Sequence, residues 1–250
     1  MQKLKLSFLF LIVLTGSIFF FGPRVPPENF QVDDLLNKAE NSDVIIIFNS
    51  GGWGNTPLEE AKDFSPIIEG IQETLNNWGL NAIVLPYNRT KDGFWGKITG
   101  IKEFSTSFKR SSEDLADKIE ILNKKLPDKN IIMAGLSNGA SFVIKTYEKI
   151  SGDFQDSVCA IAVGTPFWLK TEDKENVLEI NDAKDNLATG NIQSLFLSLL
   201  KGPFNWIYFK VIGKKNPFTR AFVAQGHNYS WSSLELRSEI VNFLEKRFKN

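Results

Sequence analysis

Four short apolar runs, each without polar alternation, constrain the fold of this 250-residue chain more than any other feature. A strand with one solvated face alternates apolar and polar residues, whereas a strand covered on both faces is continuously apolar. Segments with helical periodicity separate the runs. The sequence therefore predicts an α/β domain with a mostly parallel central sheet and helices on both faces. The runs are DVIIIF at 43–48, NAIVLPY at 81–87, NIIMAG at 130–135 and SVCAIAV at 157–163.

The segments between the runs indicate where helices begin and end. TPLE at 56–59 matches a capping box with proline at the first helical position. Apolar residues at helical spacing then predict one helix over about 66–78 and another over about 115–126, the second opened by Ser111. A last helix is predicted at about 233–248.

Composition excludes several classes of partner and site. Lysine and arginine together number 29, as do aspartate and glutamate, so no nucleic-acid partner is expected. The single cysteine, Cys159, excludes an intrachain disulfide and lies in an apolar run, which predicts a small buried residue. The single histidine, His227, is the one candidate for any mechanism that needs an imidazole. No phosphate-binding loop and no histidine pair for zinc is present, so neither a cofactor nor a metal is predicted.

The N-terminus differs from the rest of the chain. Two lysines precede an uncharged apolar run at 6–21, which is typical of a signal sequence. Because the processing signal is weak, residues 1–22 are interpreted as an uncleaved signal anchor in the membrane, with a cleaved secretory signal as the alternative. The lysines favour an extracytoplasmic domain. Residues 23–42 are interpreted as a linker and leading segment, and the domain spans 43–250.

The strongest candidate for a chemical group is Ser137. The run at 130–135 passes directly into GLSNG, which places this serine between Gly135 and Gly139. A serine on a tight turn between strand and helix exposes its hydroxyl, and small flanking residues let strand and helix approach each other. The alternative is a glycine-rich turn without a chemical role. The apolar run before the motif and the helix-forming residues after it favour a nucleophile.

His227 is the predicted partner of this serine. A hydroxyl is a poor nucleophile near neutral pH unless a base removes its proton, and imidazole suits that task best. The alternative is a surface or packing histidine. Its position after a short apolar run and C-terminal to Ser137 favours the base.

An acid is expected to orient the imidazole. NVLEI at 176–180 is a further strand pattern, and Asp182 and Asp185 follow it. A carboxylate there would hold the histidine tautomer and stabilise the imidazolium. Asp185 is preferred because its spacing between strand end and helix start suits an acid loop, and Asp182 is the alternative. Either could instead cap the following helix. Glu172 and Asp173 are more remote candidates.

Backbone donors for an oxyanion are predicted beside the serine. FNSGGWGN at 48–55 follows the first strand of the domain, and its paired glycines allow N–H groups to point into a site. An acyl-transfer enzyme needs such donors together with the amide of the residue after the nucleophile, here Asn138. The alternative interpretation is a flexible turn.

Over about residues 43–248 the chain resembles the α/β-hydrolases, whose order of serine, acid and histidine it shares. NSGGWG is similar to the H-G-G-G-[FW] oxyanion loop of lipases and esterases, with Asn49 in place of the histidine and Ser50 in place of the first glycine. The resemblance implies Gly51 and Gly52 as donors. GTPF at 164–167 also resembles a G-T-P turn of several lipase branches. The family's leading edge strands are not evident, so a reduced sheet of about six strands is expected.

Two insertions bear on the substrate. Residues 88–108 are predicted to form a loop near the site, and residues 195–218 combine aromatic residues with lysines, as a lid or a membrane interface would. The expected function is hydrolysis of a small-molecule or lipid acyl ester by a Ser137, His227 and Asp185 triad through an acyl-enzyme. Thioester or peptide hydrolysis by the same groups, and a non-catalytic lipid- or partner-binding protein on this scaffold, are the alternatives.

Overall fold

The computed structural model describes residues 32–169, 172, 174–191 and 224–249, with single residues and short stretches between 193 and 213. The predicted signal anchor at 1–22 lies outside the described residues, as does most of the lid-like insertion at 195–218. In the part of the chain that the structure describes, every helix is too short or too polar to cross a membrane.

A parallel sheet forms the centre of the domain and confirms the predicted α/β class. Five strands are paired in the order β2-β1-β3-β4-β5, and every neighbouring pair is parallel. About six strands were expected, and the described residues form five. The apolar run before His227 lies mostly outside them. The strands are β1 (Val44–Asn49), β2 (Ala82–Pro86), β3 (Asn130–Leu136), β4 (Val158–Val163) and β5 (Val177–Ile180).

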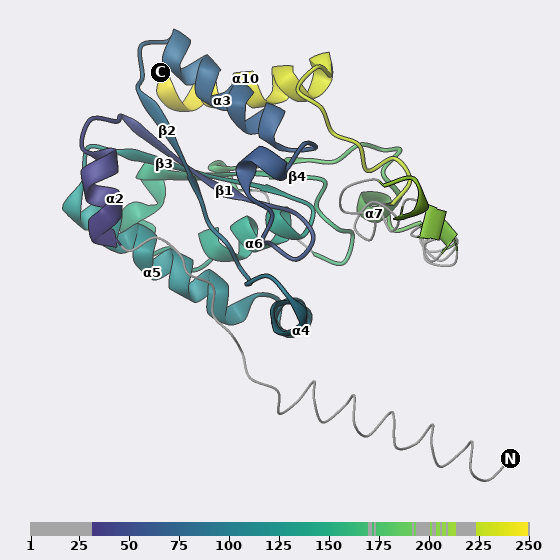
Figure 1. Cartoon of the computed structure of the whole chain (residues 1–250). Helices are drawn as coiled ribbons and strands as arrows, with labels where there is room; N and C mark the ends of the chain where they lie inside the picture. Colours follow the sequence, from purple (N-terminus) through teal and green to yellow (C-terminus); the bar gives the residue numbers. More distant parts are fainter. Residues whose placement is uncertain are drawn as a thin grey trace, which may run out of the picture.

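Helices cover both faces of the sheet (Figure 1). On one face lie α2 (Val32–Ala39), α5 (Lys109–Lys125) and α6 (Asn138–Tyr147), and on the other lie α3 (Ser65–Asn77) and α10 (Leu234–Phe248). The remaining helical elements of the described residues are η1 (Leu58–Glu60), α4 (Phe94–Ser105), η2 (Gly152–Ser157) and α7 (Asn186–Thr189). Part of the predicted linker and leading segment thus forms α2, whose Leu35 is buried in the core.

The continuous apolar runs arise because successive side chains of a strand enter two different cores. In β1, Ile45 and Ile47 pack against α5 and α6, whereas Val44 and Ile46 pack against α3 and α10. All four are fully buried. Cys159 in β4 is buried as predicted, and this burial raises the pKa of its thiol to about 12.

Two helix starts differ from the sequence expectation. The TPLE segment forms only the short 3₁₀ helix η1, which has no side-chain cap. Helix α5 begins at Lys109 rather than at Ser111, after Phe108 in a left-handed conformation. The Ser111 hydroxyl donates instead to Glu103, at 2.6 Å between the oxygens. Both expectations were wrong for the same reason: neither hydroxyl caps a helix. The Thr56 hydroxyl makes no capping hydrogen bond, and the Ser111 hydroxyl binds a side chain from another helix.

The loop predicted at 88–108 is wrong for most of its length, since Phe94–Ser105 forms α4. Two glycines lower the helix propensity of this segment, but each is needed for close packing. A Cβ on Gly96 would overlap the carbonyl oxygen of Lys91, and one on Gly100 would lie 2.8 Å from the Trp53 ring. Tertiary contacts therefore stabilise a helix that local propensity disfavours.

Candidate active site

Ser137 occupies a strained turn at the carboxyl end of β3. Its backbone has φ 56° and ψ −117°, and it is one of three described non-glycine residues with positive φ. Such a conformation costs about 1–3 kcal/mol and persists only where the surroundings enforce it. Helix α6 begins at the next residue, so the serine lies between the last residue of a buried strand and the N-terminus of a helix.

The two flanking glycines are required by close backbone contacts. A Cβ on Gly135 would lie 2.2 Å from the carbonyl oxygen of Gly139, and a Cβ on Gly139 would lie 2.4 Å from that of Asn49. Strand β3, helix α6 and the loop after β1 therefore touch through backbone atoms at this point. The spacing of the G-x-S-x-G motif reflects this packing.

We expect Gly135→Ala to lower the free energy of unfolding by about 3 kcal/mol or more, because the new methyl group meets rigid backbone rather than a mobile side chain. Gly152→Ala is the matched control, since nothing lies within 4 Å of its Cβ position, and it should change stability by less than about 0.5 kcal/mol. Urea unfolding followed by circular dichroism measures both. Equal stability of the two variants would show that the turn relaxes around the methyl group.

His227 and Asp185 are in direct contact. The distance from His227 Nδ1 to Asp185 Oδ2 is 2.7 Å, and the side chains are 11% and 0% exposed, respectively. The other carboxylate oxygen, Oδ1, accepts the Leu187 N–H at 2.8 Å and so caps α7. One aspartate thus fulfils both roles that the sequence left as alternatives, contact with the imidazole and capping of a helix.

Tyr229 is a further partner of this carboxylate. Its hydroxyl donates to Asp185 Oδ2 at 2.8 Å and accepts the N–H of Asp182 at 3.1 Å. Burial alone would raise the pKa of Asp185, but the hydrogen bond and charge of His227, with the Tyr229 and Leu187 donors, outweigh burial and lower it. The carboxylate is therefore ionised at neutral pH and suited to stabilise an imidazolium.

Of the other candidate acids, neither Asp182 nor Glu172 contacts the imidazole. Asp182 is exposed, and its Oδ1 accepts the N–H of Lys184 at 2.8 Å in the loop before α7. Glu172 is exposed, and Asp173 lies outside the described residues.

Strand β4 brings Ser137 and His227 to the same edge of the sheet. The Ser137 N–H donates to the Val163 carbonyl at 2.8 Å, and the next residue, Gly164, packs against the imidazole. A Cβ on Gly164 would lie 2.6 Å from His227 Cε1, so only glycine allows this approach. The Ser137 hydroxyl has no hydrogen bond within the described part of the chain. Such contacts often tighten only when substrate binds.

The glycine loop, residues 50–54 after β1, lies against Ser137. A Cβ on Gly51 would lie 3.7 Å from Ser137 Cβ, and the Gly52 carbonyl accepts the Asn138 side-chain amide at 3.2 Å. Within the described residues, the backbone N–H groups of Gly51, Gly52 and Asn138 have no hydrogen-bond acceptor. Free N–H groups beside a serine are the arrangement that can stabilise an oxyanion.

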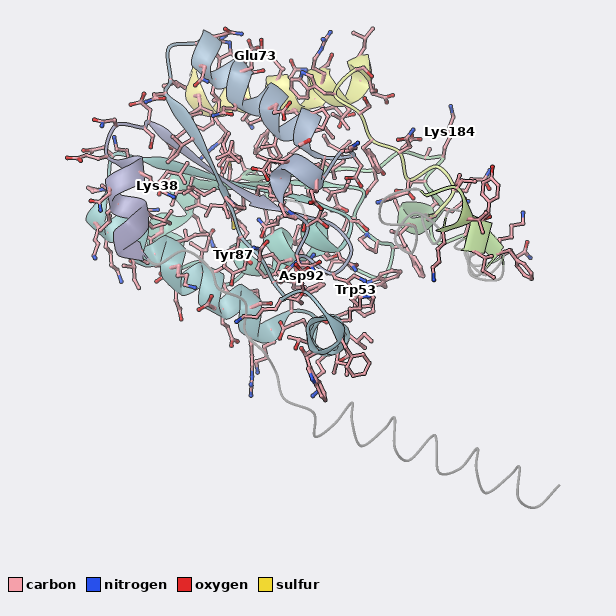
Figure 2. The ribbon with its side chains drawn as sticks, in the orientation of Figure 1. Lys38, Trp53, Glu73, Tyr87, Asp92 and Lys184 are labelled. Carbon is pink, nitrogen blue, oxygen red and sulfur yellow. The ribbon has the colours of Figure 1, made fainter. Side chains whose placement is uncertain are left out.

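A cavity of about 300 Å³ opens beside Ser137 and Asn138. Aromatic and other apolar groups line it together with the charged Arg89 and Glu103, and it lies next to α4, beside which Trp53 is labelled in Figure 2. Phe104 and Trp168 meet edge to face at one side of it, with ring centroids 5.6 Å apart. A site of this size and composition accommodates a small, mostly apolar group. The aromatic side chains that line it are Trp53, Phe104, Phe108 and Trp168.

Several residues at this site were not predicted from the sequence. Tyr229 follows His227 by two positions, a spacing that carries no recognised signal, and Trp168 follows the predicted strand 157–163. Arg89 offered a weak signal, because a charged residue within three positions of a strand's carboxyl end falls near the edge where ligands bind. In the described residues, no group of three or more histidine, cysteine, aspartate and glutamate side chains could hold a metal ion.

Two solved structures resemble this one over most of its length. A cutinase-like protein from Cryptococcus sp. is 12% identical, with a TM-score of 0.50, and the match covers 82% of this chain and 94% of that protein. An acetyl xylan esterase, solved as an iodinated complex, is 13% identical, with a TM-score of 0.50 and coverage of 81% and 97%. No protein-family model and no curated protein sequence matches the chain. At such identities the likeness concerns the fold alone, and it agrees with the predicted α/β architecture of a parallel sheet between helices.

Proposed function

We propose that this chain is a serine hydrolase that cleaves small carboxylic esters through an acyl-enzyme. The observation that carries the proposal is the buried pair of Asp185 and His227 at the sheet edge where Ser137 occupies its strained turn. A lone histidine bound to a buried, ionised carboxylate, at the same sheet edge as a half-buried serine, is the set of groups that general-base catalysis by a hydroxyl requires.

In the first step, Ser137 Oγ attacks the ester carbonyl carbon, and His227 Nε2 takes the hydroxyl proton. Asp185 keeps the Nδ1 proton in place and stabilises the imidazolium. The carbonyl oxygen becomes an oxyanion, which the N–H groups of Gly51 or Gly52 and Asn138 stabilise. The bond from carbon to the leaving oxygen then breaks, and His227 returns the proton to the departing alcohol.

In the second step, water attacks the acyl-serine and gives up a proton to His227. The bond between Ser137 Oγ and the acyl carbon breaks, the carboxylic acid leaves, and the serine regains its proton. The aromatic cavity beside Ser137 would hold the acyl group or the alcohol during both steps, and its volume of about 300 Å³ favours a small group. The likeness to a cutinase-like protein and an acetyl xylan esterase is consistent with ester cleavage.

Labelling with a fluorophosphonate probe tests the proposal without a choice of substrate. Ser137 Oγ should displace fluoride from phosphorus, and peptide mass mapping should find the adduct on the peptide that contains GLSNG. Protein unfolded in urea before labelling is the control, and it should remain unmodified. A folded protein that hydrolyses no p-nitrophenyl ester and takes up no probe would instead support a binding protein on this scaffold.

A further inference from the structure

The segment that follows β2 donates hydrogen bonds to the backbone carbonyl groups of the glycine loop. Arg89 Nη2 donates to the Ser50 carbonyl at 2.7 Å, and the Arg89 N–H donates to the Gly54 carbonyl at 2.7 Å. The Thr90 hydroxyl donates to the Trp53 carbonyl at 2.9 Å. Three carbonyls of one short loop thus have partners from two adjacent residues.

Arg89 lies unusually deep for a cation. Its side chain is 3% exposed, and its guanidinium lies over the rings of Phe108 and Phe142, with Cζ 5.1 Å and 5.5 Å from the ring centroids. Gly54 rests directly on it, since a Cβ there would lie 2.4 Å from Arg89 Nε. The guanidinium is therefore fixed between an aromatic floor and the loop.

The bond to the Ser50 carbonyl determines how the next amide points. In a planar trans peptide, the carbonyl of one residue and the N–H of the next point in opposite directions. A carbonyl of Ser50 held toward Arg89 directs the Gly51 N–H away from it, and Gly51 is the loop residue that packs on Ser137. That N–H has no acceptor within the described residues.

We propose that Arg89 is a positioning residue for the oxyanion donor, in that its guanidinium aims and polarises the Ser50–Gly51 peptide so that the Gly51 N–H meets the developing charge. This inference rests on the proposed function. A charge-assisted bond to the carbonyl draws electron density from the same peptide and makes its N–H a stronger donor.

The charge persists at working pH. Burial lowers the pKa of Arg89 to about 10, and the nearby charge of Glu103 opposes that shift, so the guanidinium is protonated in the neutral range. A neutral side chain of similar length, such as methionine, would fill the space but would neither hold the carbonyl nor supply charge.

Arg247 provides a matched control for a purely structural role. It also donates to a backbone carbonyl, that of Asp156, and its Nε, like that of Arg89, is buried without a partner within the described structure. Its Nη1 donates to Asn176 at 2.7 Å. Asn176 directly precedes β5, so this contact lies at the amino end of a strand, whereas Ser137 follows the carboxyl end of one.

The test compares Arg89→Met, Arg89→Lys and Arg247→Met with the wild type on p-nitrophenyl acetate. We expect Arg89→Met to lower kcat by about 30- to 100-fold with KM within about 3-fold, because the donor acts mainly in the transition state. Arg89→Lys keeps the charge without the forked geometry of the guanidinium, so its kcat should lie between those of Arg89→Met and the wild type. Labelling by the fluorophosphonate should slow in parallel. Arg247→Met should lower thermal stability but leave kcat within about 2-fold of the wild type.

A second readout does not depend on turnover. Selective ¹⁵N labelling of the 18 glycines reports on the Gly51 amide, whose resonance should shift in both Arg89 variants and not in Arg247→Met. A folded Arg89→Met variant with the kcat of Arg247→Met, or an unshifted Gly51 resonance, would overturn the inference while the proposed function stood. A folded wild type that the probe does not label would overturn both.

Discussion

Replacing Ser137 with alanine should lower kcat for an activated ester by about 10⁵- to 10⁶-fold, the loss typical of removing the nucleophile from a hydrolase of this kind. Binding and the oxyanion donors would remain, so KM should change little. Because alanine at a positive φ is no more strained than serine, the variant should fold with wild-type stability. Steady-state rates and urea unfolding of the same preparation measure the two effects separately.

Ser141→Ala is the matched control for that experiment. Ser141 lies one turn further along α6, is 3% exposed, and its hydroxyl has no hydrogen-bond partner in the described structure. Removing an unpaired buried hydroxyl should be neutral or slightly stabilising and should leave kcat unchanged. If Ser137→Ala retained more than a tenth of the wild-type rate, Ser137 would not be the nucleophile, whatever the result for Ser141.

The second large effect is expected for Asp185→Asn, at about 10³- to 10⁴-fold in kcat. An asparagine can keep its oxygen toward the Leu187 N–H, but its NH₂ group then faces His227 Nδ1 and Tyr229. Because Nδ1 must then accept a hydrogen bond, the proton of the neutral imidazole moves to Nε2. A protonated Nε2 cannot accept the proton of Ser137. The lowered pKa of Asp185 means that the wild-type carboxylate, by contrast, is ionised and accepts from both neighbours.

Asp182→Asn separates the two aspartates. The amide oxygen of asparagine can still accept the Lys184 N–H, so this variant should keep kcat within about 2-fold of the wild type. A loss in Asp182→Asn that matched the loss in Asp185→Asn would contradict the assignment of the acid to Asp185. Fluorophosphonate labelling rates provide an independent measure, because they depend on the same base.

The strands and the turn that carries Ser137 could be predicted because their signals are local, whereas His227 was predicted from being the single histidine of the chain and from its place C-terminal to Ser137. Each apolar run carries its own evidence of burial on two faces, and the five-residue glycine and serine motif reports close backbone contacts within one turn. Asp185 was harder to choose. A helix cap and an acid beside the imidazole demand the same residue type in the same loop, and only the fold shows that the two oxygens of one carboxylate contact both His227 and the Leu187 N–H.

Other features could not be predicted because they depend on contacts between distant segments. Helix α4 contains two glycines that weaken it alone, and its packing on Trp53 and Lys91 is visible only in three dimensions. Likewise, nothing near Arg89 in the sequence indicates that its guanidinium would reach the carbonyl of Ser50, 39 residues earlier. By composition, this arginine is one of 29 basic residues and does not stand out.

In the proposed mechanism, the two contacts of Asp185 couple catalysis to the folding of a very small element. Helix α7 has only four residues, and its first turn is held by the same side chain that orients His227. When thermal motion opens this helix, the carboxylate loses one of its donors and the imidazole loses its alignment, while the sheet and both cores stay intact. Inactivation on heating should therefore precede global unfolding, and hydrogen exchange at the Leu187 amide would report how often the resting protein visits that inactive state.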